Sequence, residues 1–489
     1  MNIGVLLVQP ETAEEKVLHI QTKLHRWANE DPDRRFGDLY NFVCDPAVLV
    51  VAWRRVSGNT GSATAGVDGQ TARYIKTADR ERSFLEGLRA DLKARTFEPL
   101  PVRERLIPKP GRKAMRRLGI PATRDRVVQA ALKVVLEPIF EADFLPCSYG
   151  FRPNRSAHDA NAEIHFYTSR CYEWVFEGDI ERCFDEISHS ALVERVRARI
   201  KDKKVIALVK ALLHAGIMTE TGQYHDTDKG TPQGGILSPV LANIALSVLD
   251  EYFAEKWETN SAKTWQRKYR RRTGRANYRL VRYADDFVVL CNGDRDHVEV
   301  LYDEIAGVLA SVGLRLAADK TKVSHIDEGI VFLGFNIKRL TRRSDGKPVV
   351  HTKPSQRSIK SVRRKVKALT GYQTQNLDLE TILIRINQIN RGWAYYHRYG
   401  VSKEIFTGLD YYTWWRDWRW IRRKHPKTPA KTLFKRYQAR TGLRANDVVL
   451  FRTASIPVKR YRRHYGHNHS IPTPWSPGHT QIDVESRMR

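Results

Sequence analysis

The chain has 489 residues, enough for several domains, and 84 Lys and Arg against 55 Asp and Glu give it a formal net charge of +29. This excess favours a polyanionic partner, nucleic acid before a membrane surface, and the 41% of hydrophobic residues excludes a disordered basic tail. No run of about 18 apolar residues occurs, and the five cysteines form no C-x-x-C pair, so we expect no membrane span, structural zinc or disulfide framework. The composition predicts an intracellular protein.

The first third of the sequence predicts helices, a loop and a basic hairpin. Apolar residues at helical spacing indicate helices over residues 10–58, and a Gly-, Ala- and Ser-rich stretch over 58–69 indicates a loop. Residues 107–121 are predicted to form two strands around a turn that is either solvated or binds phosphate. This hairpin carries three cations of interest, Lys109, Arg116 and Arg117.

The stretch Arg-Tyr-Ala-Asp-Asp-Phe at residues 282–287 is predicted to be the turn of an acidic hairpin. Apolar, β-rich segments flank it on both sides, and the small alanine before two carboxylates favours a tight turn that presents Asp285 and Asp286 at a sheet edge. Asp179 ends another predicted strand upstream. Three such carboxylates are hard oxygen ligands for Mg²⁺, and two divalent cations about 3.5–4 Å apart are what nucleotidyl transfer requires.

Two further segments are candidates for contact with a nucleotide. Phe184 follows Asp179 by five residues, a spacing at which its ring can lie under the sugar and clash with a 2′-hydroxyl; the alternative is a core phenylalanine. Gln233 and Gly234 lie in a glycine turn before a helix, where a backbone can approach a ligand closely.

The later part of the sequence predicts basic elements. Residues 268–272 are expected to be a cationic loop, and residues 331–335 a last sheet element with a glycine bend. Beyond about residue 350 we expect helices that interleave arginine with aromatic residues, a composition suited to phosphate contacts and base stacking. The tail after residue 459 is basic and then Pro-rich, so we expect it to be poorly ordered without a partner.

These segments together resemble the group II intron-encoded reverse transcriptases and maturases, of the bacterial type that lacks an HNH endonuclease. Aromatic-Ala-Asp-Asp on a hairpin is the metal-binding signature of reverse transcriptases, and the other blocks follow in the family's order. The matching blocks are Thr64–Gly69, Ile107–Pro121, Thr123–Arg126, Ser148–Ser156, Gly178–Ser188, Thr231–Pro239, Tyr283–Phe287, Gly313–Lys322, Phe332–Phe335 and Asn387–Tyr399.

The resemblance implies an α+β right-hand polymerase, with fingers and an antiparallel palm sheet followed by an α-helical thumb, the maturase X domain. We expect an N-terminal helical extension with the start of the fingers at 1–90, and the rest of the fingers and palm at 91–345. The thumb is expected at 346–450 and a basic DNA- and RNA-binding tail at 451–489.

The implied activity is RNA-directed DNA synthesis with two Mg²⁺ ions, or Mn²⁺ as a substitute, coupled to splicing assistance and retrohoming. The implied partners are group II intron RNA, target DNA and dNTPs, in a bacterial cytoplasm. The implied catalytic residues are Asp179, Asp285 and Asp286, and the implied metal site adds Ile180 to these three. The implied nucleotide-binding residues are Lys109, Arg116, Arg117, Phe184, Gln233 and Gly234, with the choice between the two arginines left open.

Two further groups of residues are implied to contact nucleic acid. The primer and template set is Lys320, Leu333 and Gly334. The intron RNA set is Arg391, Trp393, Arg416, Arg419, Arg422 and Arg463.

The alternatives are a diversity-generating or CRISPR-associated reverse transcriptase and a catalytically silent RNA-binding splicing factor. The three clustered acids, on a chain of net charge +29, argue against the silent protein. The aromatic residues of 393–396 in a long maturase-like thumb disfavour the other reverse transcriptases. His467 and His469 do not make an HNH nuclease, because that unit needs spread-out ligands and cysteine-held zinc.

Overall fold

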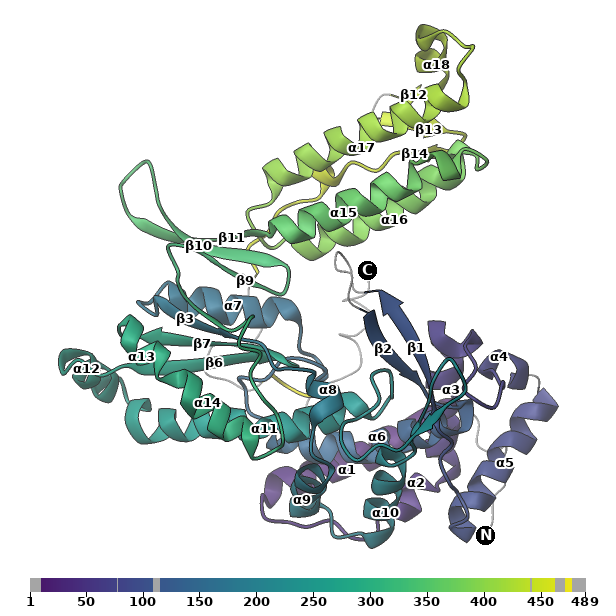
Figure 1. Cartoon of the computed structure of the whole chain (residues 1–489), viewed down its shortest axis with the longest axis vertical. Helices are drawn as coiled ribbons and strands as arrows, with labels where there is room; N and C mark the ends of the chain where they lie inside the picture. The colour runs from purple at the N-terminus through teal and green to yellow at the C-terminus, as the bar shows by residue number, and fades with distance from the viewer. Residues whose placement is uncertain (1–9, 77, 109–114, 440–441, 462–470, 477–489) are drawn as a thin grey trace.

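The structure, a computed structural model, describes residues 10–76, 78–108, 115–439, 442–461 and 471–476. It has three regions in Figure 1: a helical block with a hairpin at the lower right, a four-stranded sheet with its helices at the left, and a helical bundle above them. The α+β fold class expected from the sequence is confirmed. No described helix is long and apolar enough to cross a membrane.

The first region is built around α6, which is buried along nearly its whole length between α1 and α3. A small sheet, in the order β2-β1-β4-β5, projects from this block toward the space below the bundle (Figure 1). The elements are α1 (Pro10–Glu30), α2 (Tyr40–Val43), α3 (Pro46–Gly58), α4 (Ala72–Ile75), α5 (Ala78–Ala94), β1 (Val102–Pro108), β2 (Met115–Ile120), α6 (Thr123–Asp143), α9 (His189–Arg199), α10 (Lys203–Leu213), β4 (Ile217–Met218) and β5 (Tyr224–His225).

The second region is an antiparallel sheet in the order β6-β7-β3-β8, with α11 packed against β6. Along its strands, successive apolar residues belong by turns to two hydrophobic cores, one on each face of the sheet. This is expected for a sheet that is covered on both sides. The elements are α7 (Ala157–Thr168), β3 (Trp174–Gly178), α8 (Cys183–Glu186), α11 (Ser238–Ser261), α12 (Thr264–Arg272), β6 (Asn277–Tyr283), β7 (Asp286–Asn292), α13 (Arg295–Glu299), α14 (Leu301–Ala310) and β8 (Lys322–His325).

The third region is a bundle of α15, α16 and α17, joined to the sheet region through β9, β10 and β11 (Figure 1). The helix α15 is amphipathic: Ile359, Val362 and Val366 are buried at helical spacing, while its cations face outward. The elements are β9 (Ile330–Phe332), β10 (Phe335–Thr341), β11 (Pro348–Pro354), α15 (Gln356–Leu369), α16 (Leu379–His397), α17 (Lys403–Lys424), α18 (Ala430–Tyr437), β12 (Gln438–Ala439), β13 (Gly442–Ala445) and β14 (Val448–Val449).

The described parts of the C-terminal tail are packed, so the expectation of an unstructured tail is wrong for them. The Tyr461 hydroxyl donates to an Asp159 carboxylate oxygen at 2.7 Å, on α7 of the sheet region. Further along, Trp475 is 6% exposed and its ring lies 5.5 Å from that of His25 on α1. The hydroxyl of Thr473 lies 3.0 Å from Nε2 of the same histidine. The tail therefore contacts both the sheet region and the helical block.

The basic segment at 268–272 was expected to be a loop, and this expectation is also wrong: it lies within the helix α12. Side-chain bonds offset the repulsion among its cations, since Arg267 donates to the Ser261 and Ala262 carbonyls at 2.8 Å. Arg270 likewise donates to the Ala276 carbonyl.

A buried carboxyl group lies inside the helical bundle. Asp417 on α17 is 0% exposed, and neither of its carboxylate oxygens has a hydrogen-bond partner among the described residues. Burial raises the pKa of Asp417 well above its usual range, and the nearby positive charge of Arg416 opposes this only in part. The group is therefore neutral in the folded bundle at a pH where it is ionised in the unfolded chain.

We expect the stability of the bundle to fall as pH rises. The folded state binds one more proton than the unfolded state above the unfolded pKa of about 3.9, so unfolding releases that proton and is favoured by higher pH, by about 1.4 kcal/mol per pH unit until the folded pKa is reached. Asp417→Asn should remove this slope. Calorimetric melting of both proteins between about pH 4 and 8 checks it; parallel curves would contradict the assignment.

Candidate active site

Strand register brings the three predicted aspartates to one place. Tyr283 on β6 pairs with Asp286 on β7, which leaves Ala284 and Asp285 as a two-residue turn, with Ala284 at a φ of +56°. On the other side of β7, Gly178 of β3 pairs with Phe287. Because these strands are antiparallel, Asp179 follows β3 at the edge where Asp286 begins β7.

These acids line one large cleft between the sheet edge, the β1–β2 hairpin and the helical bundle. The cleft has a volume of about 1290 Å³. Seven predicted functional residues besides Asp285 and Asp286 line it: Arg116, Arg117, Asp179, Ile180, Phe184, Gln233 and Lys320. Lys109 lies outside the described residues. The structure thus gathers residues that are up to about two hundred positions apart in the sequence.

The carboxylates repel one another in this cleft. Burial, and then the charges of Asp285 and Asp179, raise the pKa of Asp286 to about 6. Burial and Asp179 also raise the pKa of Asp285, and Arg116 opposes that rise. Among the described residues, no group of three His, Cys, Asp or Glu side chains stands ready to hold one metal ion. Instead, the Lys320 ammonium group lies 3.1 Å from an Asp179 oxygen.

This donor set fits a divalent cation. Burial and neighbouring carboxylates raise the pKa of Asp286, and a positive ion between the acids would relieve this; the Lys320 ammonium group already lies beside Asp179. The fit requires Asp179 to exchange its partner Lys320 for the ion.

The two arginines of the β1–β2 hairpin differ in their partners. Arg117 pairs with Glu104 on the neighbouring strand, with 3.3 Å between Nε and a carboxylate oxygen. The positive charge of Arg116, the residue before it, opposes the rise in the pKa of Asp285. Successive residues of a strand point to opposite faces, so the two side chains leave β2 on opposite sides although both reach the cleft. This geometry favours Arg116 as the cation nearest the catalytic turn.

Phe184 is half-buried, packing on the core while it lines the cleft. Its ring meets that of Phe151 edge to face at 6.3 Å, and Phe151 is 47% exposed in a left-handed backbone conformation, at a φ of +59°. Nearby, Gly234 has a φ of +119°, and a Cβ there would lie 2.6 Å from the Gly119 carbonyl oxygen. Glycine is therefore required where this turn meets the β1–β2 hairpin.

Leu333 and Gly334 form the turn between β9 and β10, both with positive φ, at +45° and +80°. The Tyr396 hydroxyl of α16 donates to the Leu333 carbonyl at 2.8 Å. The turn therefore lies against the helical bundle, where the sheet region meets it (Figure 1).

The residues predicted to bind intron RNA divide into two kinds. Arg391, Arg419 and Arg422 are exposed on α16 and α17. Arg416 instead donates to Thr370 at the end of α15, at 2.9 Å to the hydroxyl and 3.1 Å to the carbonyl.

Trp393 is also held inside the bundle. Its indole N–H donates to the Ser358 hydroxyl at 2.9 Å, and its ring packs on Phe406. Internal contacts of the bundle occupy the side chains of both Arg416 and Trp393. A role of either residue in RNA binding stays a prediction. Arg463 lies outside the described residues.

Comparison with protein families decides the identity of the fold. The family model for reverse transcriptase (RNA-dependent DNA polymerase) matches residues 107–337, and the group II intron, maturase-specific domain matches residues 359–438. The chain is 37% identical over 360 residues to protein YkfC of Escherichia coli K12, across 70% of this chain and 93% of that protein. The chain belongs to the group II intron-encoded reverse transcriptase and maturase family.

Two further similarities were found for this reverse transcriptase. It is 29% identical over 486 residues to group II intron-encoded protein LtrA of Lactococcus lactis subsp. cremoris, across 85% of this chain and 79% of that protein. A solved structure of telomerase from Candida albicans aligns with a TM-score of 0.37 at 14% identity, across 70% of this chain and 64% of that one. The telomerase similarity is too weak to add to the argument.

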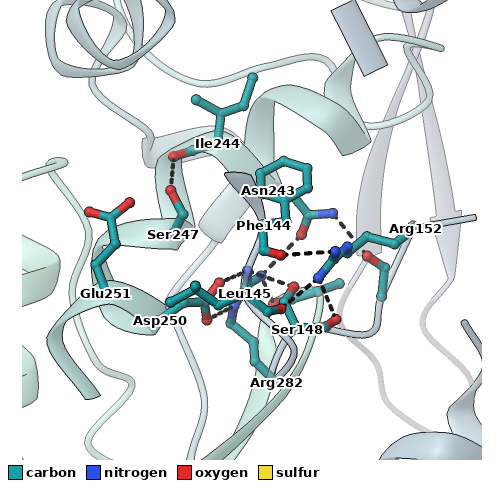
Figure 2. Close-up of polar contacts among 12 residues, drawn as sticks. Phe144, Leu145, Ser148, Arg152, Asn243, Ile244, Ser247, Asp250, Glu251 and Arg282 are labelled. Carbon is teal, nitrogen blue, oxygen red and sulfur yellow. Dashed lines mark hydrogen bonds and ion pairs between the residues drawn. The ribbon is translucent and has the colours of Figure 1, made fainter. Parts of the chain in front are cut away.

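Sequence patterns did not reveal the group that supports the catalytic turn. Arg282 is fully buried beneath it, and its Nε donates to Asp250 on α11 at 2.7 Å (Figure 2). The same guanidinium group donates to the Ala284 carbonyl at 3.1 Å, directly before Asp285. Asn243 and Ser148 accept further bonds from it, at 3.0 and 2.8 Å, and Asp250 accepts a second one. One buried cation thus joins the turn, α11 and the loop after α6.

A second buried arginine continues this network (Figure 2). Arg152 pairs with Glu141 of α6 at 2.7 Å and donates to the Ser148 carbonyl at 2.9 Å. The amide of Asn243 donates to the Gly150 carbonyl at 2.9 Å. Gly150 is packed so closely that a Cβ there would lie 2.2 Å from the Ala284 nitrogen. The loop carrying Phe151 is therefore fixed against the catalytic turn.

Arg357 is another residue that sequence analysis did not assign to the candidate site. It lies in the first turn of α15, lines the cleft and lowers the raised pKa of Asp286. It lies three residues after the end of β11, and this position near the last long strand was a signal that could have found it.

We expect the Arg282 network to affect stability and activity separately. Arg282→Met leaves Asp250 buried without its partner and should cost about 3–5 kcal/mol of unfolding free energy. The double variant Arg282→Met, Asp250→Leu should recover much of this loss, because it removes both charges. Urea unfolding and primer extension measure the two effects.

Primer extension by the double variant should stay well below wild type, because the Ala284 carbonyl has lost its donor. Full recovery of both properties would mean that the pair only stabilises the fold.

Proposed function

We propose that this reverse transcriptase uses two Mg²⁺ ions, with Mn²⁺ as a substitute, to copy intron RNA with dNTPs from a primed 3′ end in target DNA. The observation that carries this proposal is the convergence of Asp179, Asp285 and Asp286 at one sheet edge, where burial and neighbouring carboxylates raise the pKa of Asp285 and Asp286. Bound metal would lower the pKa of the 3′ hydroxyl and stabilise the charge on the pyrophosphate that leaves.

The surrounding side chains have separate roles in this proposal. Arg116 lies near the acids and neutralises the triphosphate, while Arg117 is held by Glu104. The Gly119 N–H donates to the Gln233 backbone carbonyl at 2.7 Å and so fixes the nucleotide pocket against the hairpin. Lys320 leaves Asp179 for the phosphates or the template strand when the metals bind.

The maturase part of the proposal assigns intron RNA to the outer surface of the helical bundle, which we take as the thumb. Exposed Arg419 and Arg422 continue a stripe on α17 that begins with Tyr411, which is 69% exposed, and Trp415, which is 39% exposed. Such a stripe offers rings for bases and cations for phosphates. Splicing assistance and retrohoming follow if one protein holds the intron and primes DNA synthesis on it.

The proposed domain boundaries move slightly from the expected ones. The boundary expected at 345/346 falls in the turn between β10 and β11, which pair along their full length, so we place the start of the thumb at Gln356. The tail from residue 451 onward is proposed to be part of the packed molecule as far as the structure describes it. A bacterial cytoplasmic location is consistent with the intron-bound role.

The match to the maturase-specific domain weighs against a diversity-generating or CRISPR-associated enzyme. The acids, retained in a cleft that also holds Arg116, weigh against a silent splicing factor.

We expect Asp285→Asn to lower cDNA synthesis by at least about three orders of magnitude, because metal charge stabilisation is worth several kcal/mol. RNA binding should be nearly unchanged. Primer extension on an RNA template, beside filter binding, measures both, and loss of Mn²⁺ binding by electron paramagnetic resonance gives an independent result. Asp319→Asn, which removes an exposed charge from the same cleft, is the control.

Nucleotide selection gives a second expectation. Phe184→Ala should admit ribonucleotides, because the ring beside Phe151 no longer excludes a 2′-hydroxyl. Phe184→Leu keeps most of the packing volume and controls for loss of stability. An unchanged dNTP to rNTP ratio in single-nucleotide incorporation would make Phe184 a core residue only.

A further inference from the structure

The helix α12 carries an unusual concentration of positive charge. Residues 261–275 contain seven Lys or Arg and no acidic residue: Lys263, Arg267, Lys268, Arg270, Arg271, Arg272 and Arg275. The segment lies inside the match to the reverse transcriptase model but lines no part of the cleft that holds the aspartates. In the sequence it stands between the glycine turn and the acidic hairpin. Seven neighbouring positive charges repel one another and destabilise the helix, so a binding partner that gains from them would explain their presence.

Two of these cations attach α12 to the neighbouring elements α11 and β6. Arg267 donates to the carbonyls at the end of α11, and its guanidinium group lies 5.2 Å from the Trp257 ring. Arg270 donates to the Ala276 carbonyl just before β6. These bonds fix which face of α12 turns inward.

The opposite face presents two rings and two cations to solvent. Trp265 and Tyr269 are 63% and 48% exposed, and Lys268 and Arg272 are exposed beside them. The four residues are spaced i, i+3, i+4 and i+7, so they share one face of the helix. The Arg272 guanidinium group lies 5.8 Å from the Tyr269 ring. No carboxylate pairs with Lys268 or Arg272 in the part of the chain that the structure describes.

This face is remote from the polymerase cleft. The helix precedes β6, and the aspartate turn follows the other end of that seven-residue strand, about 20 Å away at the rise of a β-strand. In Figure 1, α12 lies at the outer left end of the sheet region, on the side away from the β1–β2 hairpin. A nucleotide or primer end held by the catalytic acids therefore does not occupy it.

We propose that Trp265, Lys268, Tyr269 and Arg272 form a second RNA-binding surface, which takes an unpaired segment of the bound RNA. Exposed flat rings interleaved with unpaired cations match the two components of single-stranded RNA: bases that stack and phosphates that attract positive charge. A membrane surface would instead favour a continuous apolar face, and α12 alternates rings with charges. The inference rests on the proposed binding of intron RNA and adds where part of that RNA is held.

The test uses the full-length protein and two double variants of α12. The first, Trp265→Ala with Tyr269→Ala, removes the rings; the second, Lys268→Gln with Arg272→Gln, removes the charges. The matched control is Lys203→Gln with Lys210→Gln, which removes two exposed cations from α10, where no exposed aromatic residue stands between them. Each protein is titrated with its intron RNA and with an unstructured RNA oligonucleotide at several salt concentrations.

We expect the ring variant to bind the unstructured RNA about tenfold or more weakly. The charge variant should reduce the slope of log affinity against log salt by about 1.4, two contacts at about 0.7 each. The control should change neither quantity by as much, and extension of a short generic primed template should stay at the wild-type rate for all three. Crosslinking of 4-thiouridine RNA to residues 265–272 gives a result that does not depend on affinity.

Unchanged affinity and slope in both α12 variants, while wild type binds intron RNA, would overturn this inference and leave the proposed function in place. Equal weakening by the α10 control would also overturn it, since the effect would then be general electrostatics. Failure of wild type to bind intron RNA at all would overturn the proposed function itself.

Discussion

The structure depends on a charge placed where water cannot reach it. The Arg282 guanidinium group has no exposed surface, so every donor on it must find an acceptor inside the protein. Asp250, Asn243, Ser148 and the Ala284 carbonyl supply these acceptors from separate segments. If any of these acceptors shifts, the buried guanidinium group is left unsatisfied, which is costly. This cost is why the turn can hold one conformation although two adjacent aspartates repel each other there.

The clustered carboxylates were predictable because their signal is local. Alternating apolar strands on both sides of two adjacent aspartates specify a hairpin, and the structure places Asp285 and Asp286 at its turn. The position of Asp179 followed from strand ends in the same way. The partners of Arg282 could not be predicted, since Asp250 is 32 residues away on a helix and Ser148 is 134 residues away in a loop. The spacing of apolar residues predicts which face of a helix or strand is buried. It does not predict which buried polar atoms form hydrogen bonds with one another.

Basic segments were the least predictable part of the molecule. Lysine and arginine at high density indicated loops and RNA contacts, yet Arg267 and Arg416 donate to groups at helix ends and Arg270 donates to the carbonyl that precedes β6. An arginine that caps a carbonyl and one that faces a phosphate have the same sequence signature. Only the three-dimensional positions of orphan carbonyls separate them.

The contact between the tail and α1 has a consequence for the order of folding. Thr473 reaches His25 across 448 residues of chain. At translation rates of 5–20 residues per second, roughly 20–90 s separate the synthesis of the two partners. During that interval the nascent chain leaves the His25 side of α1 uncovered. A ribosome that stalls before residue 473 therefore presents an incomplete N-terminal block, whose uncovered surface chaperones and proteases can recognise.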